Sequence, residues 1–350
     1  MRLTGNQEYL AQLRDIRSLE FLGGKTVLVA GASGMLGSCL VDIILLGNRE
    51  KELDCKVIAL GRNGRKLEER FHDYIEDEGF KYVAYDVCQP LDGISGKVDY
   101  IIHAASNADP SNMARYPVDT LLANVIGTKN LMEYGLTHGM ERFLFVSSGE
   151  IYGQPDEEQD DFAEGYCGPI DLSSPRSCYP EGKRAAEVLC QSYASQYGAD
   201  VVIVRPCHLF GPTMSRSDSR AVAEFIWSAV DGKDIVLKSD GKRERSHCYV
   251  VDAAAAVLLA LEKGKAGDTY NIVDKRYQME IWEFAKQAAD AGGCDVIFEV
   301  PSKVDVRGYL KVSRQVLGQD KIKSLGWRPS GFSQNRIAET ITVLRVCANG

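Results

Sequence analysis

The sequence predicts an α/β fold, a doubly wound parallel sheet with a smaller C-terminal lobe. The first observation is a series of short apolar runs that alternate with helical stretches along the first two thirds of the chain. The six runs expected as strands are residues 25–30, 57–60, 81–85, 99–104, 142–147 and 199–205. Continuously apolar strands are typical of parallel sheets buried on both faces, so helices should cover both faces.

The second observation is the change of pattern after Pro206, where Gly211 and Pro212 interrupt the alternation. We therefore expect a helical extension over residues 1–22, a main domain over 23–212 that holds the sheet and a smaller lobe over 213–350, with 246–265 returning to the main domain. The extension should be one amphipathic helix over residues 6–22 that packs against the body or a partner subunit. Further helices are expected at 36–45, 120–135, 182–197, 221–230, 252–263, 280–291 and ending near 346, and short strands at 235–237 and 270–273.

Composition narrows the function classes. Of 350 residues, 45% are hydrophobic and 26% are charged, as in soluble globular proteins. The net charge of -8 argues against a partner that is a nucleic acid or a membrane surface. The ten cysteines form no C-x-x-C pair, so we expect no metal site. The polar first 22 residues and the lack of an apolar stretch of about 20 residues favour the reducing cytoplasm.

A glycine-rich turn follows the first predicted strand and precedes the first predicted helix. Its spacing is G-x-x-G-x-x-G, from Gly31 to Gly37. Small residues let a ligand approach the backbone, and the helix N-terminus offers free N–H groups, so the turn suits a dinucleotide pyrophosphate. The candidate contacts are Gly31, Ser33, Gly34, Met35, Leu36 and Gly37.

The end of the second predicted strand bears on the choice between NAD and NADP. It carries Arg62 and Asn63 in place of the acidic residue that commonly binds the adenosine ribose. Arg62 would suit a 2′-phosphate, whereas the same residues also make a good surface turn, so both cofactors stay open. Asp86, at the end of the third strand, could meet the adenine amino group or cap the strand end.

A tyrosine and a lysine four residues apart suggest redox chemistry. Tyr179 and Lys183 share one face at the start of a predicted helix. A neighbouring ammonium should lower the pKa of the phenol from about 10 towards working pH, making a base for a substrate hydroxyl. Ser148, at the end of the fifth strand, can hydrogen-bond the same oxygen.

With these motifs the chain resembles the extended short-chain dehydrogenase/reductase superfamily, in its nucleotide-sugar epimerase/dehydratase branch. The resemblance covers nearly everything from Gly24 to Pro329 and implies a Rossmann sheet that binds NAD or NADP beside a cleft for a nucleotide-diphosphate sugar. Further matching segments are 103–105, 124–128, 205–212, 245–252 and 325–329.

The resemblance also implies the roles of single residues. Further cofactor contacts would be Val87, Ala104, Ala105, Ser106, Asn124, Ser147, Tyr179, Lys183, Pro206 and His208. Substrate contacts would be Asn107, Ser148, Glu150, His208, Arg220 and Arg245, with Arg245 on the diphosphate. His208 departs from the family pattern, which often has an asparagine there, so the substrate pose is open.

Ser148-Gly149-Glu150 discriminates within the branch. By resemblance, 4,6-dehydratases and UDP-glucuronate decarboxylases carry a glutamate here, whereas 4-epimerases usually have small residues. Glu150 predicts a step after oxidation at C4, namely dehydration or decarboxylation. Gly149 replaces the aspartate that acts as the acid in some dehydratases, so a 4-epimerase stays open, and two further segments look most like the decarboxylases. The catalytic set is Ser148, Glu150, Tyr179 and Lys183.

Two wider alternatives complete the sequence-based picture. A non-catalytic cofactor-sensing protein on the same fold is disfavoured because such proteins typically lose the tyrosine or lysine. Members of the family often pair through two helices per subunit, so a homodimer through residues 120–135 and 182–197 is expected. The apolar faces of those helices could equally pack on the sheet.

Overall fold

The fold is built on a seven-stranded sheet in which every neighbouring pair of strands is parallel. The computed structural model describes residues 3–16, 19–91, 93–94, 96–156, 160–299, 314–330 and 335–349. The strand order is β10-β6-β5-β4-β1-β2-β3. The bounds are β1 Thr26–Ala30, β2 Lys56–Gly61, β3 Phe80–Ala84, β4 Tyr100–His103, β5 Arg142–Val146, β6 Val201–Pro206 and β10 Thr269–Ile272. All six predicted strands are therefore present.

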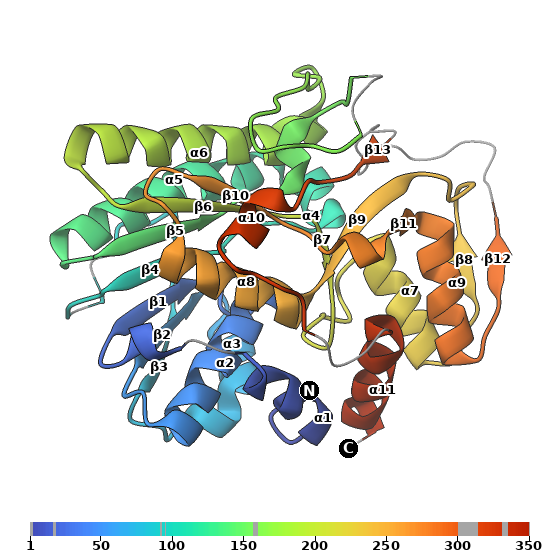
Figure 1. Ribbon diagram of the computed structural model, residues 1–350, viewed down its shortest axis with the longest axis horizontal. Coiled ribbons are helices and arrows are strands. Elements are labelled where there is room, and N and C mark those ends of the chain that lie inside the picture. The colour runs from blue at the N-terminus through green and yellow to red at the C-terminus, as the bar shows by residue number, and fades with distance from the viewer. Residues whose placement is uncertain are drawn as a thin grey trace.

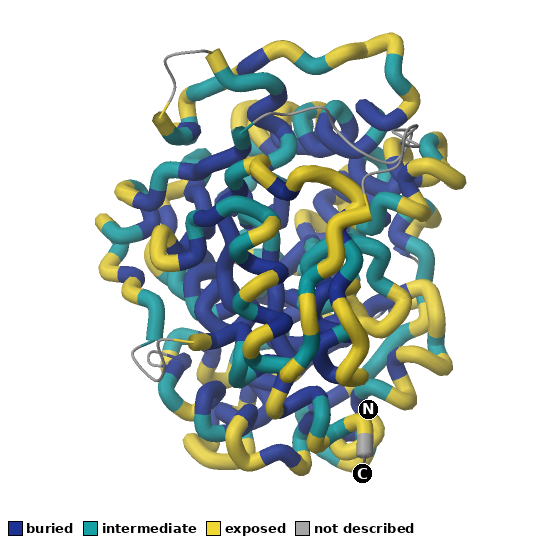
Figure 2. Tube along the Cα trace, turned by 90° about the vertical axis from the view of Figure 1, so that its right-hand side faces the viewer, coloured by how far each residue is buried: buried dark blue, intermediate teal, exposed yellow. Residues whose placement is uncertain are grey.

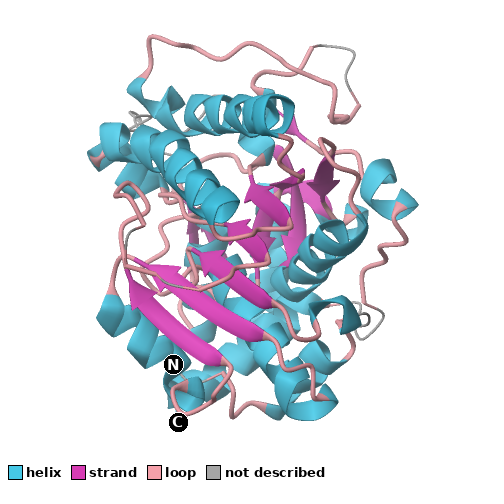
Figure 3. Cartoon of the chain, turned by 90° about the vertical axis from the view of Figure 1, so that its left-hand side faces the viewer, coloured by secondary structure: helices cyan, strands magenta, loops and turns pink. Residues whose placement is uncertain are grey.

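Alternate side chains of each strand face two separate cores. On β1, Val27 and Val29 pack in the core that includes α2 and α8, whereas Leu28 and Ala30 pack in the core under α5 and α6. The helices are α2 Met35–Lys51, α3 Gly64–Phe71, α5 Pro117–Thr137, α6 Cys178–Tyr197 and α8 Val250–Lys263. In Figure 1, α5 and α6 lie along one side of the sheet and α2, α3 and α8 along the other, and Figure 3 shows the strands between these layers. Burial on both faces explains why the strands read as continuous apolar runs.

A smaller lobe lies at the side of the sheet. Its helices are α7 Ala221–Val230, α9 Ile281–Gly292 and α11 Arg336–Asn349, which pack on one another. Its strands are β7 His208–Phe210, β8 Ile235–Leu237, β9 Glu244–Tyr249, β11 Gln278–Glu280, β12 Val296–Phe298 and β13 Arg314–Gln315. Figure 2 views the molecule from this side, with buried segments inside and exposed ones on the outer turns. No helix in the described ranges is long and apolar enough to cross a membrane.

Two sequence-based expectations about the chain's layout need correction. β10, which the sequence analysis left in the smaller lobe, pairs with β6 and is the seventh strand of the large sheet. The chain thus returns to the sheet for a strand as well as for α8. The N-terminal extension is not one helix over residues 6–22: α1 covers Gln7–Arg14, and a short 3-10 helix covers Glu20–Leu22. The separate segments let Leu13 and Leu22 both reach the same buried core.

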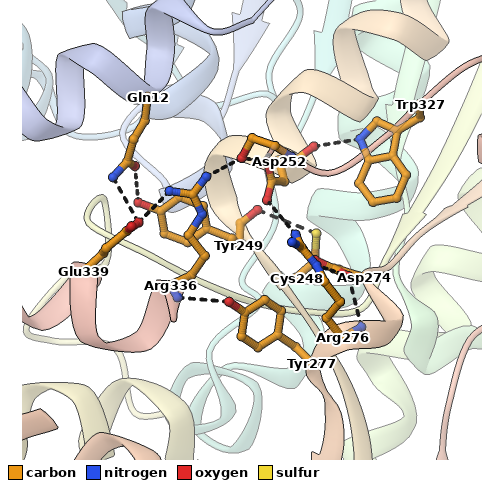
Figure 4. Close-up of polar contacts among 11 residues, drawn as sticks. Gln12, Cys248, Tyr249, Asp252, Asp274, Arg276, Tyr277, Trp327, Arg336 and Glu339 are labelled. Atoms are coloured by element: carbon orange, nitrogen blue, oxygen red, sulfur yellow. Dashed lines mark hydrogen bonds and ion pairs between the residues drawn. The ribbon is translucent and has the colours of Figure 1, made fainter. Parts of the chain in front are cut away.

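A buried polar cluster ties this extension to the smaller lobe (Figure 4). Arg336, fully buried at the start of α11, stacks its guanidinium 4.8 Å from the centre of the Tyr249 ring and pairs with Glu339. Gln12 of α1 accepts a hydrogen bond from the Tyr249 hydroxyl and donates one to Glu339, at 3.3 Å. The two ends of the chain are therefore fastened together beside β9, and the extension packs on the body.

Candidate active site

The glycine turn approaches neighbouring backbone too closely for side chains. Gly31 has a φ of +83°, and a Cβ there would lie 2.7 Å from the backbone of Ala104 and Ala105. A Cβ on Gly37 would lie 2.3 Å from the carbonyl oxygen of Gly31. The first turn of α2, which begins at Met35, therefore presents its free N–H groups against a bare backbone surface. This cradle suits a pyrophosphate.

One cavity of about 350 Å³ runs from this turn along the carboxyl edge of the sheet to the smaller lobe. It brings together most of the predicted site residues. Those lining it are Gly31, Gly34, Met35, Leu36, Gly37, Ala104, Ser106, Ser147, Ser148, Glu150, Tyr179, Lys183, Pro206, His208, Arg220 and Arg245. Ser106 and Ser147 bury their hydroxyl oxygens here with no partner among the described residues. Such groups fit a polar ligand, so the residues present suit NAD.

The remaining predicted residues do not line this cavity: Ser33, Arg62, Asn63, Asp86, Val87, Ala105, Asn107 and Asn124. Asn63 caps α3, with its side-chain oxygen 3.0 Å from the Lys66 nitrogen. Arg62 donates to the side-chain oxygen of Asn107 at 2.7 Å. The Asp86 carboxylate accepts from the Cys88 nitrogen at 2.9 Å. Arg62 follows β2, which pairs with β1, and Asp86 follows β3, which pairs with β2, at the edge where the adenosine half of a dinucleotide would extend beyond the cavity.

Tyr179 and Lys183 lie one turn apart on α6, and the lysine ammonium contacts a backbone carbonyl of β5. The Lys183 ammonium donates to the Val146 carbonyl at 2.6 Å and lies 5.8 Å from the centre of the Tyr179 ring. Burial, and then the charge of Glu150, raise the pKa of Tyr179 to about 12, although a hydrogen bond with Ser148 opposes them. Burial also lowers the pKa of Lys183 to about 7. Lys183 is therefore not among the main influences on the pKa of Tyr179, and the lowering of that pKa by the ammonium stays a prediction.

Glu150 lines the same cavity as Tyr179 and lies in the short 3-10 helix Gly149–Tyr152 that follows β5. Its backbone N–H donates to the Ser148 hydroxyl at 3.1 Å. Its two carboxylate oxygens accept from Nη2 of Arg176 at 3.0 and 2.9 Å. Arg176 is a cavity residue that the sequence analysis missed; its only signal was a basic side chain three residues before Tyr179.

The smaller lobe supplies the far wall. His208 of β7 faces His247 of β9, with ring centres 5.8 Å apart, and its Nε2 lies 3.1 Å from the Gln315 side-chain oxygen. Burial lowers the pKa of His208 to about 3 and that of His247 to about 4, so both rings are neutral. His247, Arg243 and Gln315 also line the cavity and were missed. Gln315 carries no local signal, because the pairing of β13 with β9 brings it to the site. It lies 107 residues from His208 in the sequence.

The arginines of the smaller lobe make the cavity electropositive. Arg220 pairs with Asp218 just before α7, and Arg245 on β9 donates to the Glu244 carbonyl at 2.8 Å. Burial is the main reason that the pKa of Arg245 falls to about 10, because it destabilises the charged guanidinium. A bound anion would offset this destabilisation. Among the described residues no group of three or more histidine, cysteine or acidic side chains could hold a metal ion.

Several known proteins are similar to this chain in sequence or in fold. UDP-glucuronic acid decarboxylase 1 of Xenopus tropicalis is 34% identical over 272 residues, which are 77% of this chain and 61% of that relative. The chain therefore spans about three fifths of that relative's length. The dTDP-glucose 4,6-dehydratase of an Actinoplanes species is 28% identical over 331 residues, 91% of this chain and 97% of the relative.

Among solved structures, DesIV of Streptomyces venezuelae, a dTDP-glucose 4,6-dehydratase with NAD and TYD bound, is similar with a TM-score of 0.78 at 25% identity. It covers 93% of this chain and 98% of its own. Residues 27–273, more than half of the chain, match a family described as the NAD dependent epimerase/dehydratase family. These matches are consistent with the glycine cradle and with the cavity lined by Ser148, Tyr179 and Lys183. The chain belongs to the NAD dependent epimerase/dehydratase family.

Proposed function

We propose that the protein is an NAD-dependent enzyme that removes the C6 carboxylate of a nucleotide-diphosphate sugar acid after oxidising the sugar at C4. The sugar would lie between the carboxyl edge of the sheet and the smaller lobe. The similarity to UDP-glucuronic acid decarboxylases supports this reaction class. A 4,6-dehydratase is the second candidate, because a relative of that kind is covered over 97% of its length.

The observation that favours decarboxylation is the confined space at Gly149. A Cβ there would lie 3.1 Å from both terminal methyl groups of Leu317 and 3.5 Å from the Pro206 carbonyl oxygen. An acidic side chain beside Glu150 would therefore have to displace Leu317. Loss of water needs a proton donor for the departing C6 hydroxyl. Loss of carbon dioxide from a β-keto acid needs no such donor, so a glycine suffices.

The charge of the cavity supports a substrate with more than one anionic group. Three arginines of the smaller lobe line the cavity. Arg245 lies on β9, Arg243 directly precedes β9, and Arg220 directly precedes α7. Glu150 is the one carboxylate among the described cavity residues, and it is already paired with Arg176. A diphosphate together with a sugar carboxylate matches this excess of positive charge.

The chain's residues would act in a fixed order. Ser148 orients the C4 hydroxyl, and Tyr179 accepts its proton once the phenol, whose pKa is raised by burial, has ionised. Lys183 holds the start of α6 in place through its hydrogen bond to the Val146 carbonyl. When bound, NAD would supply the acceptor for the C4 hydride and the donor for its return. The C4 ketone is β to the carboxylate, so the C5–C6 bond breaks, carbon dioxide leaves and the electron pair forms an enolate. A proton from solvent at C5, return of the hydride to C4 and return of the Tyr179 proton to the C4 oxygen complete a redox-neutral cycle.

Product masses test this proposal. The protein is incubated with UDP-glucuronate, UDP-glucose or dTDP-glucose, each with NAD or NADP. Loss of carbon dioxide from UDP-glucuronate is expected, and Tyr179→Phe should retain NAD while losing at least about a thousandfold in turnover. Loss of water from dTDP-glucose would establish the dehydratase, and an epimer of unchanged mass the 4-epimerase. Bound NAD without any turnover would indicate a cofactor-sensing protein.

We also propose a cytoplasmic homodimer. α5 and α6 expose Val118, Leu122, Val188 and Tyr197, the first and third at 65% and 66%. An apolar surface of this kind suits a helical dimer interface. All ten cysteines are free, as a reducing compartment would keep them. Sizing in solution, with Val188→Glu as the disrupting variant, tests the dimer.

A further inference from the structure

One buried ion pair in the cavity lies outside the serine, tyrosine and lysine set. Nη2 of Arg176 bridges both carboxylate oxygens of Glu150, at 3.0 and 2.9 Å. The Arg176 side chain is 6% exposed and that of Glu150 is 18% exposed. A buried guanidinium on a carboxylate fixes the geometry as well as the charge of its partner.

The backbone around Arg176 is fixed immediately ahead of Tyr179. Arg176 lies in the 3-10 helix Pro175–Ser177, whose end is also the start of α6. Ser174 caps that 3-10 helix through the Arg176 N–H, at 3.3 Å, and the Ser177 hydroxyl donates to the Asp171 carbonyl at 2.5 Å. Arg176 and Tyr179 are therefore linked by a short, hydrogen-bonded stretch of helical backbone, and the ion pair fixes where Glu150 lies relative to that stretch.

Other titratable and charged groups also act electrostatically on Glu150 or Tyr179. Glu150 is within electrostatic reach of Arg245 on β9 and of Cys178 at the start of α6. Glu150 raises the pKa of Tyr179, whereas Ser148, Arg176 and Arg220 lower it. Arg176 is the one of these cations that contacts Glu150 directly in the described structure.

We propose that Arg176 is a positioning residue that holds Glu150 in place as a charge-compensated carboxylate beside Tyr179. The inference rests on the proposed function, because it assigns Arg176 to the same oxidation and carbon–carbon cleavage. With both oxygens of Glu150 held, the carboxylate remains oriented towards C5 and C6 of the sugar. With its charge compensated, it opposes formation of the Tyr179 phenolate less than a lone carboxylate would.

A second buried arginine–glutamate pair, Arg205 and Glu187, lies outside the active-site cavity and serves as a comparison. Arg205 of β6 contacts both oxygens of Glu187, at 2.9 and 2.6 Å, and also donates to the Tyr152 hydroxyl and the Glu164 carbonyl. Neither Arg205 nor Glu187 lines the active-site cavity. The Arg176 pair differs because it faces the cavity and lies within electrostatic reach of the proposed base.

The test follows NADH formation in a single turnover of the NAD-loaded enzyme with UDP-glucuronate, as a function of pH. The rate of NADH formation should rise with pH as Tyr179 ionises, and this part of the pH–rate profile is called the rising limb. In Arg176→Met the rising limb should move to higher pH by about one unit, so the rate at pH 7 should fall about tenfold. Arg176→Lys should keep the wild-type limb, because the charge remains, but lose turnover after oxidation, because a flexible ammonium replaces the rigid guanidinium that places Nη2 between the two oxygens. Glu150→Gln should move the limb to lower pH.

Two further variants separate positioning from general stability. Arg176→Met combined with Glu150→Gln should return the limb towards the wild type, because the pair is removed as a neutral unit. Arg184→Met is the matched control, since Arg184 holds the Ile151 and Gly168 carbonyls at 2.8 and 2.7 Å without contacting Glu150. It should lower stability and leave the limb unchanged.

The outcomes separate this proposal from the proposed function. If the wild type forms no NADH with any nucleotide sugar, the proposed function fails. If the wild type turns over and Arg176→Met keeps the wild-type limb, the role of Arg176 is refuted and the function stands. An equal shift in Arg184→Met would also refute it. If Arg176→Met does not fold, Glu150→Gln decides instead: a rising limb that does not move to lower pH in that variant refutes the role of Arg176.

Discussion

The two walls of the active-site cavity are built in different ways. On the sheet side, backbone packs directly on backbone. Gly31 lies against the peptide of Ala104, and Gly37 lies against the carbonyl group of Gly31. On the lobe side, the wall consists of side chains, among them His208, His247 and Leu317. Backbone atoms cannot move aside for a new side chain, whereas the end of a flexible side chain can. The sheet side should therefore tolerate very little change and the lobe side considerably more.

The largest effect is expected on the sheet side, at Gly37. In Gly37→Ala the new Cβ would lie 2.3 Å from the carbonyl oxygen of Gly31, so the turn must separate from α2. We expect a loss of about 3 kcal/mol in the free energy of unfolding and a loss of NAD binding. Urea unfolding and calorimetric titration with NAD would measure both.

Gly34→Ala is the graded control for that substitution. Its Cβ would lie 3.2 Å from the same carbonyl oxygen, a contact that a shift of a few tenths of an ångström relieves. It should cost clearly less than Gly37→Ala. Equal losses in the two variants would show that the close approach at Gly37 is not what limits the turn.

A smaller effect is expected on the lobe side, from the neutral ring of His247. Burial lowers the pKa of His247 to about 4 in the folded chain, and its Nδ1 lies 3.0 Å from the Tyr277 carbonyl oxygen. In the unfolded chain the pKa is about 6.5. Below pH 6.5 the unfolded state thus binds the additional proton, so stability falls as the pH falls from about 6.5 to about 4.

His247→Asn should remove this dependence, because the amide can donate to the same carbonyl and does not titrate. Between pH 7 and pH 5 the wild type should lose about 2 kcal/mol more than the variant. Urea unfolding of both proteins at the two pH values gives that difference directly. Parallel losses in the two proteins would mean that other groups carry the acid sensitivity.

The same contrast explains how much the sequence alone predicts. On the sheet side the glycine spacing, the apolar runs and the tyrosine–lysine pair are local patterns, and they place Gly31, Ser148, Tyr179 and Lys183 at one edge. On the lobe side His247 and Gln315 reach the cavity through strand pairing with distant segments, which no local pattern encodes. The seventh strand, β10, was misplaced for the same reason.

Electrostatics was the part of the site least accessible from sequence. The four-residue spacing of Tyr179 and Lys183 is correct, yet the ammonium points to the Val146 carbonyl and burial dominates both groups. A spacing rule gives which residues share a helix face, but not how deeply that face is buried. Arg176 illustrates the same limit, since its partner Glu150 is 26 residues away in sequence.

The smallest effect is expected at Gly149, where the two walls meet. In Gly149→Ala the new Cβ would lie 3.1 Å from the terminal methyl groups of Leu317, which can rotate away, so stability should change by less than about 1 kcal/mol. Gly149→Asp needs more room and should fit only together with Leu317→Ala. If the double variant then removed water from dTDP-glucose while Gly149→Asp alone did not, the space beside Glu150 would be what separates decarboxylation from dehydration. A large loss of stability in Gly149→Ala would instead show that Leu317 is held as rigidly as the backbone around Gly37, and the contrast between the two walls would not hold.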